Sequence, residues 1–128
     1  SRFFPFLPAL IDNRDYSFTL LSLEEIKHLK EYFQNKNALF TDFPDYFSKE
    51  EIKRQADPRL QPYLFHKKRI PFAQYCDSCY LMLDFIPGNL GQAGQILCYV
   101  HDPDEVLYVC PDITSLIDDI RENIITTS

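Results

Sequence analysis

Four cysteines are the first residues whose spacing could support chemistry. Cys76 and Cys79 form a CxxC motif, and Cys98 and Cys110 follow downstream. A zinc site would require all four thiolates to converge, and thiol–disulfide exchange would require the motif to open a helix within a βαβ unit. The CxxC instead lies at a predicted turn between strands, and Cys98 lies within a strand, where a thiol packs as a small apolar group. We therefore expect ordinary cysteines, no metal and no cofactor.

All three glycines of the chain lie in the short segment 88–94. A loop that cradles phosphate would follow a strand, open a helix and carry a lysine. Here a predicted strand follows the glycines, and the nearest charge is Asp84. Glycine used this sparingly marks backbone that needs a positive φ or a close approach, so the segment is predicted to be a structural connection between strands. Its residues are Pro87, Gly88, Gly91, Gly94 and Gln95.

One histidine and three acidic residues lie at the end of the predicted strand 95–101 and directly after it. They are His101, Asp102, Asp104 and Glu105. Such groups can ligate a metal or transfer protons, but the two other histidines, His28 and His66, have no spacing that joins them to this cluster in a triad. The run 102–104 instead fits the first places of a type I turn that links two strands. We therefore expect no catalytic residue here and no enzyme.

Two capping boxes place helices on the chain. Ser22 is followed three residues later by Glu25, and Ser48 is followed in the same way by Glu51. In this pattern each side chain satisfies a free backbone N–H of the other residue at a helix start. The predicted helices span residues 22–35 and 48–56. The second should end before Pro58, because the residue preceding a proline is pushed out of the α region.

The rest of the chain predicts a strand meander closed by a helix. Aliphatic and aromatic runs separated by Pro, Gly, Asn and Asp indicate short antiparallel strands. The runs are residues 16–21, 70–73, 80–86, 95–101 and 106–110, preceded by an extended segment over residues 1–15. Ile113, Leu116, Ile117, Ile120 and Ile124 follow helical spacing. That helix, capped by Asp112 or Ser115, should cover one face of the sheet, so residues 1–128 are predicted to be one α+β domain.

The distribution of charged residues along the chain limits the kind of partner that the protein is expected to bind. The net charge is −6, and there is no Lys or Arg between Arg69 and Arg121. The acids in that stretch are Asp77, Asp84, Asp102, Asp104, Glu105, Asp112, Asp118 and Asp119. Such a field repels nucleic acid and attracts basic proteins, although these acids could also serve only to keep the protein soluble. No apolar run reaches the ~20 residues of a membrane span, and the cysteines lack a disulfide framework, so we expect a cytoplasmic protein.

The order of several short motifs resembles the SUKH superfamily. The motifs are Ile70-Pro71-Phe72-Ala73, Leu83-Asp84 to Pro87-Gly88, Gly91, Gly94-Gln95-Ile96, Tyr99-Val100-His101-Asp102 and Asp112-Ile113-Thr114-Ser115-Leu116-Ile117. This superfamily includes yeast cell-wall-assembly regulators and bacterial polymorphic-toxin immunity proteins. The resemblance covers roughly residues 62–120, and the stretch from Asp-x-x-Pro-Gly to Gly-Gln-Ile is its most specific part.

The resemblance implies an α+β fold without catalysis or cofactor, and it leaves two hypotheses. The first is an immunity protein that neutralises a basic toxin of the nuclease or deaminase class by direct binding. Its docking residues would be Asp84, Asp102, Asp104 and Glu105. The second is a regulatory adaptor without a toxin partner. The chain has no tryptophan, and the Leu-Pro and Asn-Gly of the family's opening helical segment have no clear match at Leu7-Pro8, so we expect the amino end to be divergent or truncated.

Overall fold

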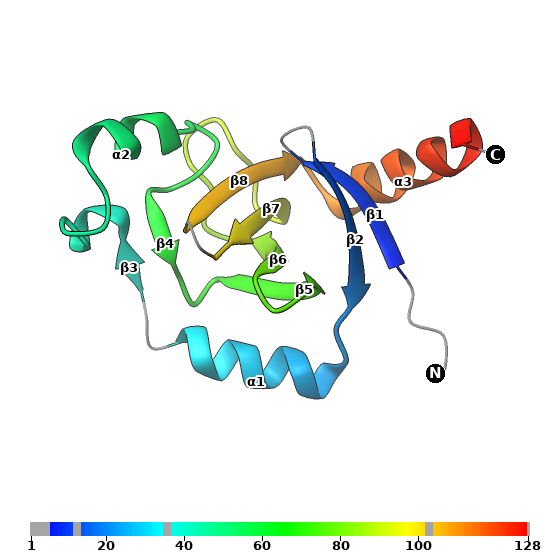
Figure 1. The fold of residues 1–128 in the computed structure, drawn as a ribbon, viewed down its shortest axis with the longest axis horizontal. Coiled ribbons are helices and arrows are strands. Elements are labelled where there is room, and N and C mark those ends of the chain that lie inside the picture. The colour runs from blue at the N-terminus through cyan, green and yellow to red at the C-terminus, as the bar shows by residue number, and fades with distance from the viewer. Residues whose placement is uncertain (1–5, 12–13, 35–36, 102–103, 128) are drawn as a thin grey trace.

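The computed structural model describes residues 6–11, 14–34, 37–101 and 104–127. The strands are β1 (Phe6–Ile11), β2 (Arg14–Leu20), β3 (Ala38–Leu39), β4 (Tyr63–Phe65), β5 (Arg69–Tyr75), β6 (Cys79–Asp84), β7 (Gln95–Val100) and β8 (Glu105–Cys110). The helices are α1 (Leu23–Gln34), α2 (Lys49–Gln55) and α3 (Ile113–Thr127), with a short 3₁₀ turn, η1 (Phe40–Asp42). Figure 1 shows how the helices surround the strands.

The main sheet confirms the predicted meander. Among the described residues it has six strands in the order β1-β2-β5-β6-β7-β8, and every neighbouring pair is antiparallel. Strands β5 to β8 follow one another in sequence and in space, as the runs from residue 70 to residue 110 predicted. A second, two-stranded sheet of β3 and β4 was not predicted. The fold is α+β, with helices flanking a mostly antiparallel sheet.

The amino-terminal stretch pairs with the sheet as a hairpin, which sequence analysis predicted only as an extended segment. Strand β1 pairs with β2, and Pro8 lies opposite Ser17. A proline has no N–H to give to a neighbour, but β1 is the outer strand of the sheet and needs a partner on one side only. Residues 1–5 and 12–13 lie outside the described residues.

Both capping boxes form as predicted. The Glu25 N–H donates to Ser22 Oγ at 3.1 Å, and the Ser22 N–H donates to Glu25 Oε1 at 2.9 Å. Ser48 and Glu51 make the same exchange ahead of α2, which ends before Pro58 as expected. Among the described residues, no helix has the length and apolar character needed to span a bilayer.

The sheet buries side chains on both faces. Ile96 and Cys98 of β7 point into one apolar cluster, whereas Leu97 and Tyr99 point into the other. The first cluster is Phe18, Ala73, Cys79, Leu81, Ile96, Cys98, Cys110 and Leu116. The second is Phe40, Phe47, Leu64, Met82, Leu97, Tyr99 and Val106. Burial on both sides explains why residues 96–100 of β7 form an unbroken apolar run rather than an alternating one.

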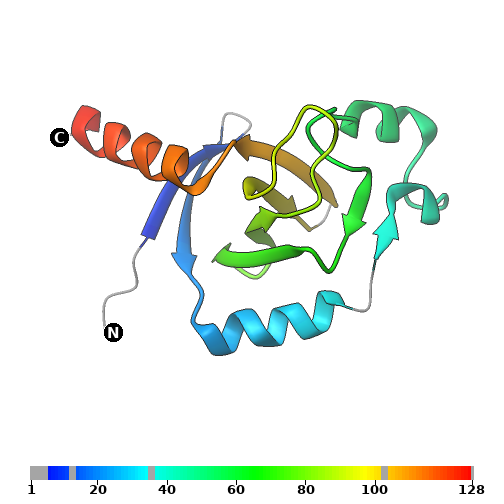
Figure 2. The ribbon, with the colours of Figure 1, turned by 180° about the vertical axis from the view of Figure 1, so that it is seen from behind.

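Helix α3 covers less of the sheet than its apolar spacing predicted. Leu116 is buried in the first cluster, and the Ser115 N–H donates to Asp112 Oδ1 at 2.7 Å, so Asp112 caps the helix. Ile113 and Ile117 are exposed. Figures 1 and 2 show the far half of α3 extending past β1, away from the sheet. The side chains of Ile120 and Ile124 lie outside the described residues.

Candidate protein-binding site

Asp84 is not part of any surface, which corrects its predicted role in docking a partner. Asp84 lies at the end of β6 and is 0% exposed. Its Oδ2 accepts a hydrogen bond from Gln95 Nε2 at 2.9 Å, and its Oδ1 accepts one from the Ile86 N–H at 3.0 Å. The carboxylate therefore serves the interior of the protein, because no partner can reach it without unfolding this end of the sheet.

Arg69 supplies the balancing charge for Asp84. It is 3% exposed, and its Nε lies 3.6 Å from Asp84 Oδ1. The guanidinium also donates to the backbone carbonyls of Tyr63 and Gln61. Burial lowers the pKa of Arg69, and the neighbouring Asp84 carboxylate opposes that shift. The pair joins β5 and β6 to the segment that leads into β4.

The glycine segment connects β6 to β7 and packs closely against residues 58–60. A Cβ on Gly91 would collide with the Arg59 carbonyl and the Gln95 side chain, and Gly94 has φ +88°. Gln95 Nε2 also donates to the Arg59 carbonyl at 2.7 Å. Pro87 and Gly88 contact the same segment. Pro87 forms an isolated β-bridge with Leu60, and the Gly88 N–H donates to the Arg59 carbonyl. The loop is therefore shaped by close approach to residues 58–60.

The four cysteines differ in burial. Cys76 is exposed at the turn, whereas Cys79, Cys98 and Cys110 are buried in the first apolar cluster. Burial raises the pKa of the Cys98 thiol to about 12 and that of Cys110 to about 11. These two sulfurs therefore stay protonated near neutral pH, which makes them poor nucleophiles and weak ligands.

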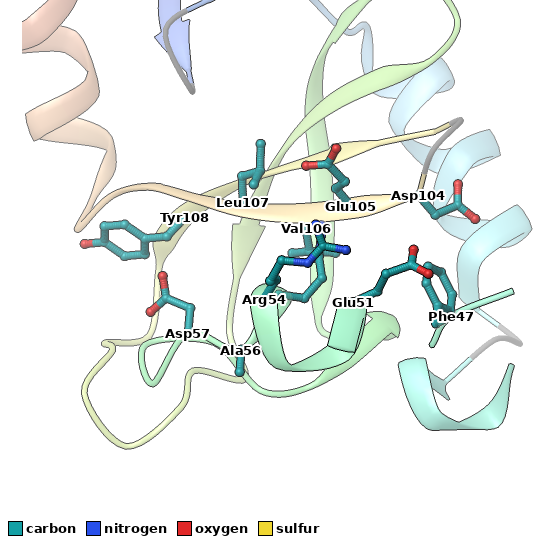
Figure 3. Close-up of a pocket in the computed structure, with 11 residues that line it drawn as sticks. Phe47, Glu51, Arg54, Ala56, Asp57, Asp104, Glu105, Val106, Leu107 and Tyr108 are labelled. Atoms are coloured by element: carbon teal, nitrogen blue, oxygen red, sulfur yellow. The ribbon is translucent and has the colours of Figure 1, made fainter. Parts of the chain in front are cut away.

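Two of the predicted docking residues, Asp104 and Glu105, line a groove between α2 and the edge strand β8. The groove has a volume of about 630 Å³. It is lined by Phe47, Glu51, Arg54, Gln55, Ala56, Asp57, Asp104, Glu105, Val106, Leu107 and Tyr108. Figure 3 shows α2 presenting Glu51 and Arg54 toward β8, with Asp104 at one end and Asp57 and Tyr108 at the other, while the Glu105 side chain leaves β8 on the side away from α2.

A hydrogen bond from a side chain of α2 links the two walls of this groove. The Val106 N–H of β8 donates to Gln55 Oε1 of α2 at 3.1 Å. The amide oxygen takes the place that the carbonyl of a further strand would occupy, so it satisfies a backbone donor at the edge of the sheet. Gln55 therefore holds the short helix α2, whose own residues are not buried, against β8.

At one end of the groove, Asp57 forms a paired wall with Arg59. Its carboxylate accepts from Arg59 Nε at 2.9 Å and from a terminal guanidinium nitrogen at 2.7 Å. The same guanidinium lies 3.6 Å over the ring centre of Tyr108. The hydrogen bond from Arg59 holds the pKa of Asp57 below its ordinary value. Bidentate pairing and ring stacking fix this arginine, so the wall is rigid.

At the other end, Asp104 is held by two neighbours. Its Oδ1 lies 2.7 Å from His101 Nδ1 and accepts from the Tyr99 hydroxyl at 3.1 Å. Of the residues predicted to cluster after β7, the structure brings His101 and Asp104 into contact, whereas Asp102 and Pro103 of the predicted turn at 102–104 lie outside the described residues.

Sequence reasoning missed the contribution of α2. Glu51 was identified only as a capping residue, and Asp57 was not singled out at all. Neither position carries a local signal of its role, because α2 and β8 are far apart in the chain and meet only in the fold. Of the described residues lining the groove, Glu51, Asp57, Asp104 and Glu105 are acidic and Arg54 alone is basic.

Comparison with known proteins agrees with the resemblance found in the sequence. No curated protein matches the chain. A protein family does match, over residues 3–119, so the match takes in the amino-terminal hairpin as well as the strands and loop that carry the sequence motifs. Because it spans most of the chain, we conclude that this chain belongs to the SMI1 / KNR4 family (SUKH-1).

Proposed function

We propose that this chain is a non-catalytic protein-binding domain that works as an immunity protein, neutralising a basic toxin of the nuclease or deaminase class by direct binding. The observation that carries the proposal is the acidic lining of the groove between α2 and β8. Family membership supports a role of this kind. Reduced thiols persist in the cytoplasm, so the buried free cysteines are compatible with action there.

The charge of the groove indicates which face of a toxin would dock. Enzymes that act on nucleic acids present basic surfaces to the phosphate backbone. A groove rich in carboxylates complements such a surface, and opposite fields accelerate encounter by orders of magnitude when salt does not screen them. Asp104 and Glu105 remain docking residues in this proposal and are joined by Glu51. Asp102, which follows β7 beside them in sequence, is proposed to take part as well.

Coexpression tests the toxin hypothesis directly. The protein encoded beside this chain in its native genome would be expressed with and without it, and growth would be scored. The proposal expects growth arrest by the neighbour alone and rescue by this chain. A neighbour that is harmless alone, or whose toxicity persists despite a complex, counts against neutralisation.

Salt dependence tests whether the groove is the docking surface. We expect the association rate with the basic partner to fall steeply between low and physiological salt, and to fall in the variant Glu51→Gln/Asp104→Asn/Glu105→Gln. Asp118→Asn, on the exposed face of α3, is the matched control and should leave the rate nearly unchanged. An association rate independent of salt would contradict the electrostatic part of the proposal.

The second candidate function is a regulatory adaptor of the cell-wall-assembly regulator type, which the family match supports equally. In that case the acids of the groove would be a solvated face or would bind a signalling protein. Affinity purification from the native host separates the two. A single basic, lethal partner favours the immunity protein, whereas several signalling proteins favour the adaptor.

A further inference from the structure

A second hollow lies beside the groove and differs from it in chemistry. Its volume is about 460 Å³. It is lined by Leu29, Tyr32, Phe65, Asp77, Tyr80, Tyr99, His101 and Asp104. Asp104 lines both cavities, so the aromatic hollow begins where the acidic groove ends. Aromatic rings and carboxylates in one cavity are the combination that attracts an organic cation.

The rings of the hollow are held by the fold. Phe65 and Tyr99 have ring centres 5.4 Å apart, and Tyr80 is stacked on Tyr99 at 6.4 Å with 17° between the planes. They come from three strands, β4, β6 and β7, whose spacing the sheets fix. Tyr32 from α1 adds a wall that is 61% exposed. Ring faces carry negative potential, and a cation gains most where the rings are already in place.

The carboxylates at the hollow favour a cation, and His101, which also lines it, lies 2.7 Å from Asp104 Oδ1. Asp77 and Asp104 contribute carboxylates, and none of the described residues lining the cavity is Lys or Arg. Burial, and then Asp104, raises the pKa of Tyr99, while burial followed by Asp77 raises that of Tyr80. Both hydroxyls therefore stay protonated near neutral pH, and the tyrosines keep their neutral rings.

We infer that this hollow receives the charged end of a lysine or arginine side chain from the partner, while the partner's neighbouring residues lie in the groove beyond Asp104. The inference rests on the proposed function, because it names an anchor within the same docking surface. Positively charged side chains that insert into aromatic pockets next to a polar groove are typical binding hot spots. A basic toxin has such side chains on the face that the groove would cover.

The test uses isolated side-chain mimics, so it does not depend on knowing the partner. The ¹⁵N-labelled full chain is titrated with N-acetyl-arginine amide and N-acetyl-lysine amide, and amide shifts are followed by NMR. We expect saturable shifts at Asp77, Tyr80 and His101. The uncharged N-acetyl-citrulline amide should produce none. Tetramethylammonium, which represents a free organic cation, should bind more weakly than the two mimics.

Variants locate the binding. Tyr32→Leu removes an exposed ring with little risk to folding, and Asp104→Asn removes a carboxylate. Each should weaken binding by about 2- to 5-fold, the range that a single cation–π or exposed charge contact supports. Tyr46→Leu and Asp45→Asn are the matched controls, since both residues are exposed and lie outside the hollow; they should leave the affinity unchanged.

Three results would overturn the inference: equal shifts with the citrulline derivative, unchanged affinity in both hollow variants, or tighter binding of tetramethylammonium than of the mimics. None of these touches the rescue of growth or the salt dependence of association, so the proposed function would stand without the anchor. If this chain failed to rescue growth while the mimics still bound saturably, the proposed function would be contradicted and the cation-binding hollow would stand.

Discussion

Two regions of this molecule use acidic residues in opposite ways. The buried network joins Asp84 to Arg69 and Gln95 at the end of the sheet, and Asp84 is 0% exposed. The acidic groove holds Asp104 and Glu105 at the surface. Asp84, Asp104 and Glu105 come from the same stretch without Lys or Arg. In sequence they look alike, but burial separates them.

The difference shows that charge pattern alone does not define a binding surface. A carboxylate taken out of water is tolerated only when hydrogen bonds and an opposite charge replace its hydration, and it then fixes the local structure. A carboxylate left in water keeps its long-range field and remains able to attract a partner. Within the motif from Asp84 to Gln95, the most specific part of the family resemblance, the buried Asp84 and Gln95 side chains hold the local structure together.

The largest expected effect comes from breaking the buried pair. Asp84→Ala leaves Arg69 as a buried charge without its counterpart, and we expect a loss of about 3–5 kcal/mol in the free energy of unfolding. Urea unfolding followed by circular dichroism would measure it. Asp104→Ala, in the groove, should cost no more than about 1 kcal/mol.

A double variant sharpens this result. Arg69→Met/Asp84→Leu removes both charges together, so it should recover part of the stability lost in Asp84→Ala. Equal losses for Asp84→Ala and Asp104→Ala would remove the distinction between the two regions.

A smaller effect is expected from the loop that encloses the network. Gly91→Ala places a methyl group against the Arg59 carbonyl and the Gln95 side chain, and Gln95 is the residue that donates to Asp84 of the buried pair. Overpacking of this kind costs about 1–3 kcal/mol. The exposed Ala93→Ser change in the same loop is the control and should be nearly neutral in urea unfolding. A neutral Gly91→Ala would mean that the loop can move away from residues 58–60.

The link between α2 and β8 should contribute less. Gln55→Ala leaves the Val106 N–H without its acceptor, at a cost of about 0.5–1.5 kcal/mol. Amide hydrogen exchange at Val106 should become faster, because the edge strand loses its cover. Gln55→Glu keeps an acceptor oxygen and should restore protection. Unchanged exchange in the alanine variant would show that the helix does not depend on this contact.

The smallest effect concerns pH. The pKa of Asp57 is lowered by Arg59, so this pair contributes stability above the ordinary aspartate pKa and loses it as pH falls through the lowered value. The contribution is small because the Arg59 side chain is 44% exposed. Carboxyl ¹³C shifts should place the Asp57 titration below the ordinary 3.8, and Arg59→Gln should move it back up. A titration at or above 3.8 in the parent chain would contradict the pairing.

Local signals predicted most of the fold. Capping boxes at Ser22 and Ser48 located two helices, because the hydrogen bonds involved join residues three apart. Strands β5 to β8 were found because each is a compact apolar run bounded by turn residues. The hairpin strand β1 was missed as a strand, since Pro8 is unfavourable in a strand unless that strand lies at the sheet edge, and edge position is a property of the whole sheet.

By itself the sequence determined the α+β class and the family, both of which depend on motifs of residues close together in the chain. Only the tertiary structure decided that Asp84 is buried, that Glu51 and Asp57 of the α2 region line the same groove as Asp104, and that the aromatic hollow adjoins this groove at Asp104. Burial and the meeting of distant segments depend on how β8 packs beside α2. Periodicity and spacing carry no record of such packing, because they report only on neighbours along the chain.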